Sequence, residues 1–354
     1  MPESWPEPLL SPLLLAAYIA CVTGAGALAN CSLLAVLHKS SARGLFSIIL
    51  QLAIADIVLS ASISPEVWSY NMQSWMLGTR GCIAYRGLSV FASTASSYLV
   101  ATLALHTLAT TNLEEKELMR RNRRSDQVED DEMRSSRHSL VAGSDSSTPP
   151  RTMNLDYRVS AVSIPITQPT LFVWILSLSL CVPDFALATT VHFALATTVH
   201  LDQNTVVCTI VDSSQRLQLY TILALMNLVL PILLLCATLA LVVIKLKSKS
   251  HLNQIHRCES IASLKLSLWL LLVYFILSVP RSTLIAFNTY SASLRANETA
   301  LHESVQYYYK SSSIGLAFSS TYLGSILVRP LLCIVLLPSV KRAFTSGLRD
   351  TANV

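Results

Sequence analysis

The residues of this chain that could do chemistry are a few ionisable side chains in or beside long apolar stretches. Asp56 and Arg329 each lie inside such a stretch, and Arg86 and Arg281 lie near the ends of two others. An ionisable group at membrane depth is costly unless it is paired or faces a cavity, so these residues predict charge pairing or ligand recognition. The sequence has no metal-ligand cluster, phosphate-binding loop or nucleophile constellation. We therefore expect neither an enzyme nor a cofactor or metal site.

Seven apolar stretches hold these residues and dominate the sequence. A bilayer core about 30 Å thick needs about 20 mostly apolar residues per helix, and each stretch is long enough. Only 13% of the 354 residues are charged, whereas a soluble domain carries about 25%. Because lipid offers backbone groups no partner, such segments are helices, and we expect an all-α membrane protein. The stretches cover residues 9–37, 45–70, 83–109, 169–191, 216–246, 261–288 and 312–338.

The basic residues predict the orientation of these spans. If the N-terminus lies outside, most of the 26 Lys and Arg fall in cytoplasmic segments, as the positive-inside rule requires. Residues 1–8 carry no Lys or Arg, so we expect an extracellular N-terminus with the first span as the anchor. The basic residues follow the spans rather than forming one face, which excludes a nucleic-acid partner. We expect a multi-pass protein of the plasma membrane with a cytoplasmic C-terminus.

Cysteine positions predict one disulfide. In this topology Cys82 and Cys208 face the oxidising side, while the other cysteines fall inside spans or in the cytoplasm. Disulfides persist outside the reducing cytosol, so we expect Cys82 and Cys208 to pair. Asn297 begins an Asn-Glu-Thr sequon on the same side, and we expect it to be glycosylated.

Short motifs stand at regular places along the seven stretches. Asn30 follows a Gly-Ala-Leu-Ala run, and Asp56 ends the run Leu-Ala-Ile-Ala-Asp. A Trp-x-x-Gly-x-x-x-Cys pattern ends at Cys82, and the fourth stretch contains Trp174. The last three stretches carry prolines, and an amphipathic segment follows them; these are Pro231, Pro280, Pro330 and Val340–Phe344. In order and spacing the motifs resemble those of the rhodopsin-like (class A) G-protein-coupled receptors.

That resemblance implies a seven-transmembrane bundle with a short amphipathic eighth helix. The position of Pro65, nine residues after Asp56, resembles that of a proline in peptide receptors of the galanin and allatostatin group. The implied partners are an extracellular ligand and, inside, a G protein or an arrestin-like adaptor. The chain then divides into an outer N-terminus, three spans, a long cytoplasmic loop, four spans and an amphipathic tail, over residues 1–8, 9–109, 110–168, 169–338 and 339–354.

The motifs that operate the switch in that family differ here. Where the third span of the family ends in Asp-Arg-Tyr, this chain has His106, Thr107 and Leu108, the residues expected at the cytoplasmic coupling position. The seventh span has Arg329 before Pro330 in place of Asn-Pro, and the sixth span lacks the tryptophan before its proline. Three altered motifs argue against ordinary agonist-driven G-protein activation.

The resemblance also implies an intramembrane switch of Asn30, Asp56, Arg329 and Pro330. In the family, the positions of Asp56 and Arg329 both face a central sodium site. We therefore expect Arg329 to lie beside Asp56 and to replace the cation, because Arg keeps its proton and pairs well with carboxylate. The alternative is that Arg329 extends to the cytoplasmic surface.

Candidate ligand-binding residues lie at the outer ends of several spans. Arg86 and Arg281 indicate an acidic group on the ligand, as in a peptide or an acidic small molecule. The alternative is that both arginines pair internally or extend outward. Ser89 stands where amine receptors of the family carry Asp, which argues against an amine ligand. The candidates are Trp68, Tyr85, Arg86, Ser89, Asp184, Tyr274 and Arg281.

Two further segments stand out between the spans. Residues 185–192 recur unchanged as residues 193–200. A shift of eight residues keeps a strand in phase, so the second copy suits a strand in the second outer loop. The alternative is a recent duplication or a fault in the sequence. Residues 110–168 are rich in mixed charges and then in Ser, Pro and Gly, and we expect them to be disordered.

These observations favour a cell-surface receptor that binds an extracellular peptide or acidic ligand. One alternative is a receptor-like protein without G-protein activation, acting as a decoy, a scavenger or a modulator of a partner receptor. A transporter or channel on a seven-helix scaffold is less favoured, because transporters usually show two similar halves and none is visible here.

Overall fold

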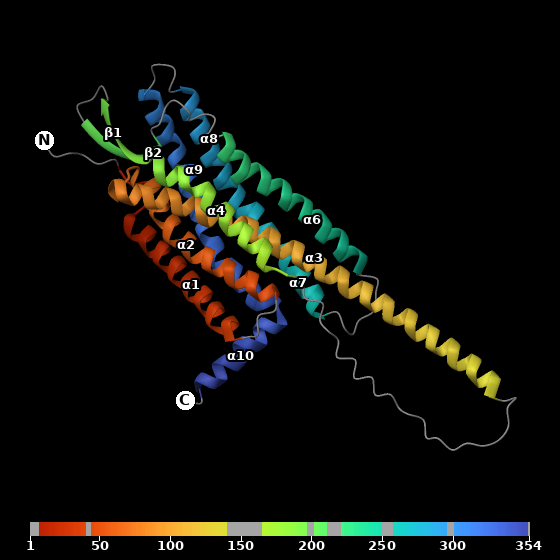
Figure 1. Ribbon diagram of the computed structural model, residues 1–354. Helices are drawn as coiled ribbons and strands as arrows, with labels where there is room; N and C mark the ends of the chain where they lie inside the picture. The colour runs from red at the N-terminus through yellow and green to blue at the C-terminus, as the bar shows by residue number, and fades with distance from the viewer. Residues whose placement is uncertain are drawn as a thin grey trace.

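The computed structural model describes residues 7–39, 44–139, 165–196, 202–210, 221–249, 258–295 and 301–352. Among these residues, seven helical segments are long and apolar enough to cross a bilayer, the number that the seven apolar stretches predict. They lie together as a bundle (Figure 1). The elements are α1 (Pro12–Lys39), α2 (Gly44–Met72), α3 (Gly78–Ser139), α4 (Thr167–Leu187), β1 (Ala188–Ala196), β2 (Asp202–Ile210), η1 (Leu225–Val229), α6 (Leu230–Lys249), α7 (Cys258–Val273), η2 (Tyr274–Ser278), α8 (Val279–Arg295), α9 (Leu301–Leu336) and α10 (Pro338–Ala352).

Two spans contain a short π-helical segment. η1 lies within the span Thr221–Ser248, and η2 joins α7 to α8 within the span Glu259–Asn288. Pro231 follows η1 and Pro280 follows η2, each by two residues. Proline has no backbone N–H and clashes with the turn before it, so a widened turn relieves the clash. Each span therefore continues through its proline.

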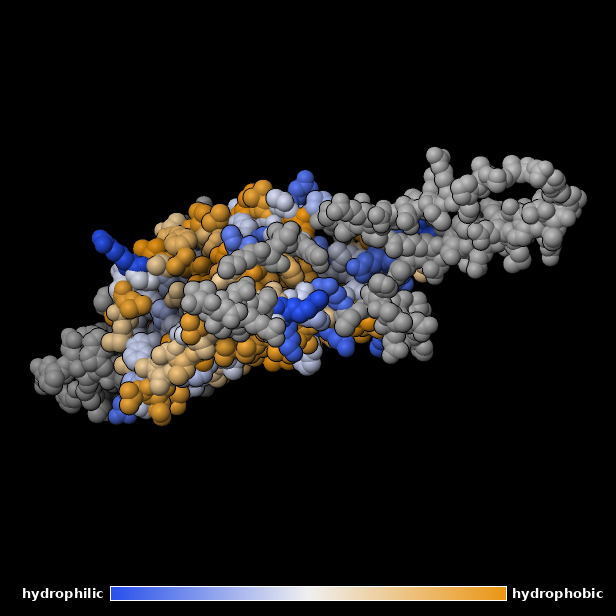
Figure 2. All heavy atoms as spheres, turned by 90° about the horizontal axis from the view of Figure 1, so that it is seen from below, coloured by the Kyte–Doolittle hydropathy of each residue, from blue (hydrophilic) through white to orange (hydrophobic). Residues whose placement is uncertain are grey.

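The outer surface of the bundle is apolar. Leu13 of α1, Ile175 of α4, Leu233 of α6 and Val335 of α9 are all more than half exposed. Figure 2 shows apolar side chains over much of the face that it presents. Lipid tails are as apolar as these side chains, so a bilayer accommodates such a surface.

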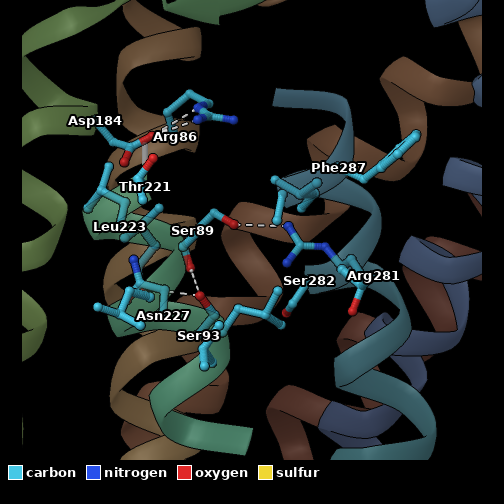
Figure 3. Close-up of a pocket in the computed structure, with 18 of the residues that line it drawn as sticks. Arg86, Ser89, Ser93, Asp184, Thr221, Leu223, Asn227, Arg281, Ser282 and Phe287 are labelled. Carbon is cyan, nitrogen blue, oxygen red and sulfur yellow. Dashed lines mark hydrogen bonds and ion pairs between the residues drawn. The ribbon is translucent and has the colours of Figure 1, made fainter. Parts of the chain in front are cut away.

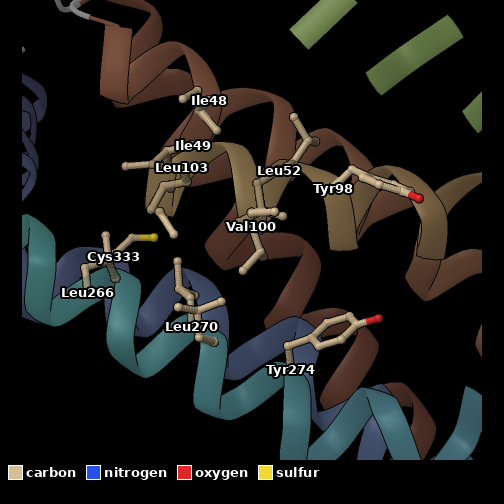
Figure 4. Close-up of a cluster of buried hydrophobic side chains, with 14 of the residues drawn as sticks. Ile48, Ile49, Leu52, Tyr98, Val100, Leu103, Leu266, Leu270, Tyr274 and Cys333 are labelled. Carbon is tan, nitrogen blue, oxygen red and sulfur yellow. The ribbon is translucent and has the colours of Figure 1, made fainter. Parts of the chain in front are cut away.

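α3 lies at the centre of the bundle, where it contacts α2, α4, α6 and α7. Ala92, Ala95, Ser96 and Ala101 of α3 are fully buried, and small residues of this kind let neighbouring helices approach closely. Ala92 belongs to the cluster of Leu59 and Ile63. Around Ala95 and Ala101, larger apolar side chains form the main cluster (Figure 4). It includes Ile48, Ile49, Leu52, Leu103, Leu266 and Leu270.

Gly26 and Asn30 bring α1 against α9. Asn30 Nδ2 donates to the carbonyl oxygen of Gly26 at 2.9 Å and to that of Ile326 at 3.2 Å. A Cβ atom on Gly26 would lie 3.0 Å from Ile326 Cγ2, whereas a Cβ atom on Gly24 would meet nothing within 4 Å. The close approach of these two helices therefore depends on Gly26 having no side chain.

An antiparallel hairpin of β1 and β2 closes one end of the described bundle. The predicted disulfide is present: Cys82 of α3 is bonded to Cys208 of β2, with the two Cα atoms 5.5 Å apart. Trp75 N donates to the Val206 carbonyl oxygen at 2.7 Å, so the loop between α2 and α3 is also tied to β2. We call this region, marked by Cys82, Cys208 and the hairpin, the disulfide end.

The repeated sequence adopts two conformations. The first Phe-Ala-Leu, at residues 185–187, ends α4, and the second, at residues 193–195, lies in β1. The predicted strand is therefore present, but it already begins at Ala188 in the first copy. Residues 197–200 and the sequon at Asn297 lie outside the described residues.

The structure corrects the loop predicted between the third and fourth spans. α3 continues as one helix to Ser139 and runs past the opposite end of the bundle, here called the α10 end after the helix that follows α9 there (Figure 1). Residues 118–139 contain no Gly or Pro and are rich in Arg, which favours helix. Residues 140–164 lie outside the described part, and the membrane-lying position of α10 stays a prediction.

A larger side chain at Gly26 should separate α1 from α9. We expect Gly26→Leu to lower the free energy of unfolding by about 1–3 kcal/mol, the usual cost of overpacking. Gly24→Leu is the matched control, because its side chain would point into open space. Thermal unfolding of both variants in detergent micelles checks the prediction, and equal stability of the two would contradict it.

Candidate functional site

A buried ion pair joins α2 to α9 near the middle of the bundle. Arg329 Nη1 donates to Asp56 Oδ1 at 2.6 Å, and the two side chains are 2% and 1% exposed. The hydroxyl of Ser96 accepts from the same nitrogen, and that of Ser278 accepts from Nη2 at 3.3 Å. The predicted partnership of Asp56 with Arg329 is therefore confirmed, and Arg329 does not extend to the surface.

A second buried pair joins α2 to α8, closer to the disulfide end. Arg281 donates through Nε to Glu66 Oε1 at 2.9 Å and through Nη2 to Oε2, which makes the pair bidentate. Two hydroxyls also donate to the Glu66 carboxylate: Tyr85 Oη to Oε2 at 2.8 Å and Ser319 Oγ to Oε1 at 2.6 Å. The carboxylate of Glu66 thus holds four helices together: α2, α3, α8 and α9.

A third pair joins α3 to α4 at the disulfide end. Arg86 Nη2 lies 2.8 Å from Asp184 Oδ1, and Nε donates to the same oxygen at 3.1 Å. The Asp184 side chain is 2% exposed, but that of Arg86 is 18% exposed. This pair therefore reaches the edge of the bundle, whereas the other two are enclosed.

The two enclosed pairs belong to one polar column. Asp56 and Glu66 are ten residues apart on α2, which corresponds to about 15 Å along a helix. Between them lies Tyr322 of α9, which is 2% exposed, and the guanidinium carbon of Arg281 sits 4.9 Å from the centre of its ring. An arginine over an aromatic face is attracted by the ring quadrupole.

A cavity of about 550 Å³ lies beside this column. Its walls come from α3, α4, the beginning of the span Thr221–Ser248 and α8 (Figure 3). Cavities that bind small molecules measure about 300–1,000 Å³. Asn227 of η1 and Ser282 of α8 lie on facing walls, with Ser89 and Ser93 of α3 between them.

Most of the predicted pocket residues line this cavity. Tyr85, Arg86, Ser89, Asp184 and Arg281 contribute to its wall. Among the described residues, Trp68 and Tyr274 do not. Trp68 packs on the apolar cluster around Leu59 and Ile63, and Tyr274 is buried in the central cluster.

The cavity arginines were predicted to attract an acidic ligand, with internal pairing as the alternative. Arg86 is paired with Asp184 and Arg281 with Glu66, so the alternative is the one that the structure bears out. Each guanidinium already has a carboxylate, and an acidic ligand would have to compete with it.

At the α10 end, a buried hydrogen bond and a partly exposed ion pair link α3 to its neighbours. Thr107 and Ser267 share a hydrogen bond of 2.8 Å between α3 and α7, and both are fully buried. Lys245 of α6 lies 2.5 Å from Glu115 of α3 in a partly exposed ion pair. The neighbours of Thr107 in the predicted coupling triplet, His106 and Leu108, are half-buried and buried, respectively.

Glu66 is the residue that sequence reasoning missed. It directly follows Pro65, which was noticed, and it is the second acid of the second span. The rule that an ionisable residue at membrane depth marks a site and has a partner would have found it. Asn227 carried no such signal, because it is not ionisable.

The fold and the site define a class: a multi-pass helical membrane protein that is tied by buried ion pairs and contains a cavity of ligand size. No protein-family model matches the chain, and no curated protein matches it closely enough to count as a relative. Any narrower assignment depends on the sequence motifs and the site.

Removing either partner of the Asp56–Arg329 pair should leave a buried charge alone. We expect Asp56→Asn and Arg329→Asn each to lower the free energy of unfolding by about 3–5 kcal/mol. The double variant should lose clearly less than the sum of the two, because it leaves no uncompensated charge. Denaturation in detergent micelles measures all three, and additive losses would show that the two residues do not interact.

The Glu66–Arg281 pair should matter more for stability than the Arg86–Asp184 pair. Glu66→Gln strands the guanidinium of Arg281 among buried groups, at an expected cost of about 3–5 kcal/mol. Asp184→Asn leaves Arg86, which is partly exposed and can reach water, at an expected cost of about 1 kcal/mol. The two variants are isosteric with the native residues, so unfolding temperatures compare them directly. Equal losses would contradict the ranking.

Proposed function

We propose that this protein is a seven-transmembrane receptor of the G-protein-coupled type in the plasma membrane. Its N-terminus and disulfide end lie outside, and its ligand occupies the 550 Å³ cavity. The order and spacing of the motifs support this proposal, as does the disulfide between Cys82 and Cys208. The cytoplasmic partner is a G protein or an arrestin-like adaptor.

One observation carries the proposal: helices that line the cavity are also joined to one another at the α10 end, far from the cavity. α3 and the span Thr221–Ser248 line the cavity, and Glu115 and Lys245 join the same two helices at the other end. α8 lines the cavity and continues through η2 into α7, where Ser267 bonds to Thr107. A ligand that moves η1 therefore acts on the Lys245–Glu115 link, and a ligand that moves α8 acts on the Ser267–Thr107 link.

The ionic links favour one arrangement of the bundle in the absence of ligand. Arg329 connects α9 to α2 through Asp56, to α3 through Ser96 and to η2 through Ser278. A ligand shifts such an equilibrium only by its difference in affinity for the two arrangements. The receptor is thus biased toward a resting state that the ligand must outweigh.

A second candidate is a receptor-shaped binding protein that does not activate G proteins. The observation that favours it is Thr107, which is buried against Ser267 and offers no cation to a cytoplasmic partner. Such a protein would hold or remove a ligand, or would modulate a partner receptor. The two candidates share the cavity and differ only in what happens at the α10 end.

Loss of the Thr107–Ser267 hydrogen bond should raise basal signalling if the protein is a receptor. We expect Thr107→Val to increase basal second messenger per surface molecule roughly fivefold, because a hydrogen bond of about 1 kcal/mol no longer holds α3 to α7. Thr102→Val is the matched control, since that hydroxyl bonds only the Tyr98 carbonyl oxygen of its own helix. Cyclic AMP, inositol phosphate and arrestin recruitment are measured in parallel in cells. If all three stay at the level of untransfected cells in every variant, the second candidate is favoured.

A further inference from the structure

We infer that the cavity takes a neutral single-chain lipid, with a carbonyl between its head and its acyl chain, that enters from the bilayer between η1 and α8. The inference rests on the proposed function, because it names the ligand class of the same cavity. It departs from the acidic ligand that the sequence predicted.

The mouth of the cavity opens on the lipid-facing side of the bundle. Leu225 and Val229 of η1 and Phe287 of α8 line the cavity and are also 53%, 42% and 55% exposed, respectively. A side chain that both lines a cavity and is exposed lies at its mouth. These residues, like the exposed Thr221 and Thr283 that also line the cavity, belong to helices long and apolar enough to cross a bilayer, so we infer that the mouth opens toward lipid.

The charges beside the cavity cancel within the protein. Arg86 is neutralised by Asp184, and Arg281 by Glu66, which also accepts from Tyr85. A charged ligand would have to break one of these pairs and leave its partner buried, which is strongly unfavourable. The cavity therefore selects a ligand without net charge.

The polar groups that remain for a ligand are neutral. Asn227 lines the cavity, and its Oδ1 accepts from Thr94 Oγ1 at 2.7 Å, which leaves the Nδ2 amide as a donor for a ligand. Ser282 presents a hydroxyl from the facing wall of α8 (Figure 3). A carbonyl oxygen satisfies the amide donor, and a hydroxyl or amide of the head group can pair with Ser282.

The apolar residues fit an acyl chain that leads from these groups to the mouth. Asn227 lies between Leu225 and Val229 on the same π-helical segment, so the polar anchor is two residues from each of these residues at the mouth. π-Helical turns often occur at functional sites. A lipid with its head at Asn227 and its chain at Val229 and Phe287 places its polar part beside polar groups and its apolar part beside apolar groups. Ester- or amide-linked single-chain lipids have both parts.

Photolabelling of the purified full-length chain in phosphatidylcholine nanodiscs tests the inference. The probe is a monoacylglycerol with a diazirine and an alkyne on its acyl chain. We expect saturable labelling that maps to η1 and α8. Unlabelled monooleoylglycerol should compete with the probe and reduce this labelling, whereas oleate should not. This arm uses the native chain alone, so it does not depend on the folding of any variant.

Variants then test the anchor and the mouth separately. Asn227→Leu should weaken labelling about tenfold, because the carbonyl loses a buried hydrogen bond. Val229→Trp should block the mouth and lower labelling. Leu233→Trp is its matched control, one helical turn further along the same exposed face and outside the cavity. Unfolding temperatures confirm that each variant is folded.

Several outcomes would overturn the inference. Labelling that does not saturate and spreads over all lipid-facing helices would mean bulk lipid contact only. Competition by oleate as strong as that by monooleoylglycerol would mean an acidic ligand. Unchanged labelling of Val229→Trp would mean entry from the aqueous side. Saturable labelling without any second messenger would leave the inference standing and count against the receptor function.

Discussion

Charge pairing inside a low-dielectric bundle is the constraint on which the rest of this structure depends. Three acids and three arginines meet across helix boundaries, and each pair connects a different combination of helices. An arginine left alone at this depth would cost several kcal/mol, so the helices must sit where their charges can meet. The apolar exterior explains why the helices cross a bilayer, whereas the pairs explain how each one is rotated.

Features that depend on local pattern could be predicted from the sequence. The seven spans follow from the length of apolar runs, and the bond between Cys82 and Cys208 follows from the side on which each cysteine falls. The pairing of Asp56 with Arg329 followed from similarity to a family, because only a known bundle places the second and seventh spans face to face. The charges alone would have allowed Asp56 to pair with any of three arginines, Arg86, Arg281 or Arg329.

Other features could not be predicted, because they depend on helix rotation. A membrane helix that is apolar all round carries no stripe to show which side faces its neighbours, so nothing in the sequence assigned Arg281 to Glu66. The repeat makes the same point at a smaller scale. Phe-Ala-Leu ends a helix at residues 185–187 and forms a strand at residues 193–195, so its surroundings decide its conformation. The extension of α3 was missed for another reason: a dense charge pattern was interpreted as disorder, although its residues favour helix.

The two π-helical segments give the bundle a reserve of chain length. A π turn holds one residue more than the α-helical turn that it replaces, so η1 and η2 each contain a residue that a regular helix would not need. A deletion of one residue within Leu225–Val229 closes that turn and keeps the facing of both flanking parts of the span, but it restores the clash with Pro231. At the cost of that clash, the span Thr221–Ser248, which borders the cavity, can change its length by one residue while the rest of the bundle keeps its contacts.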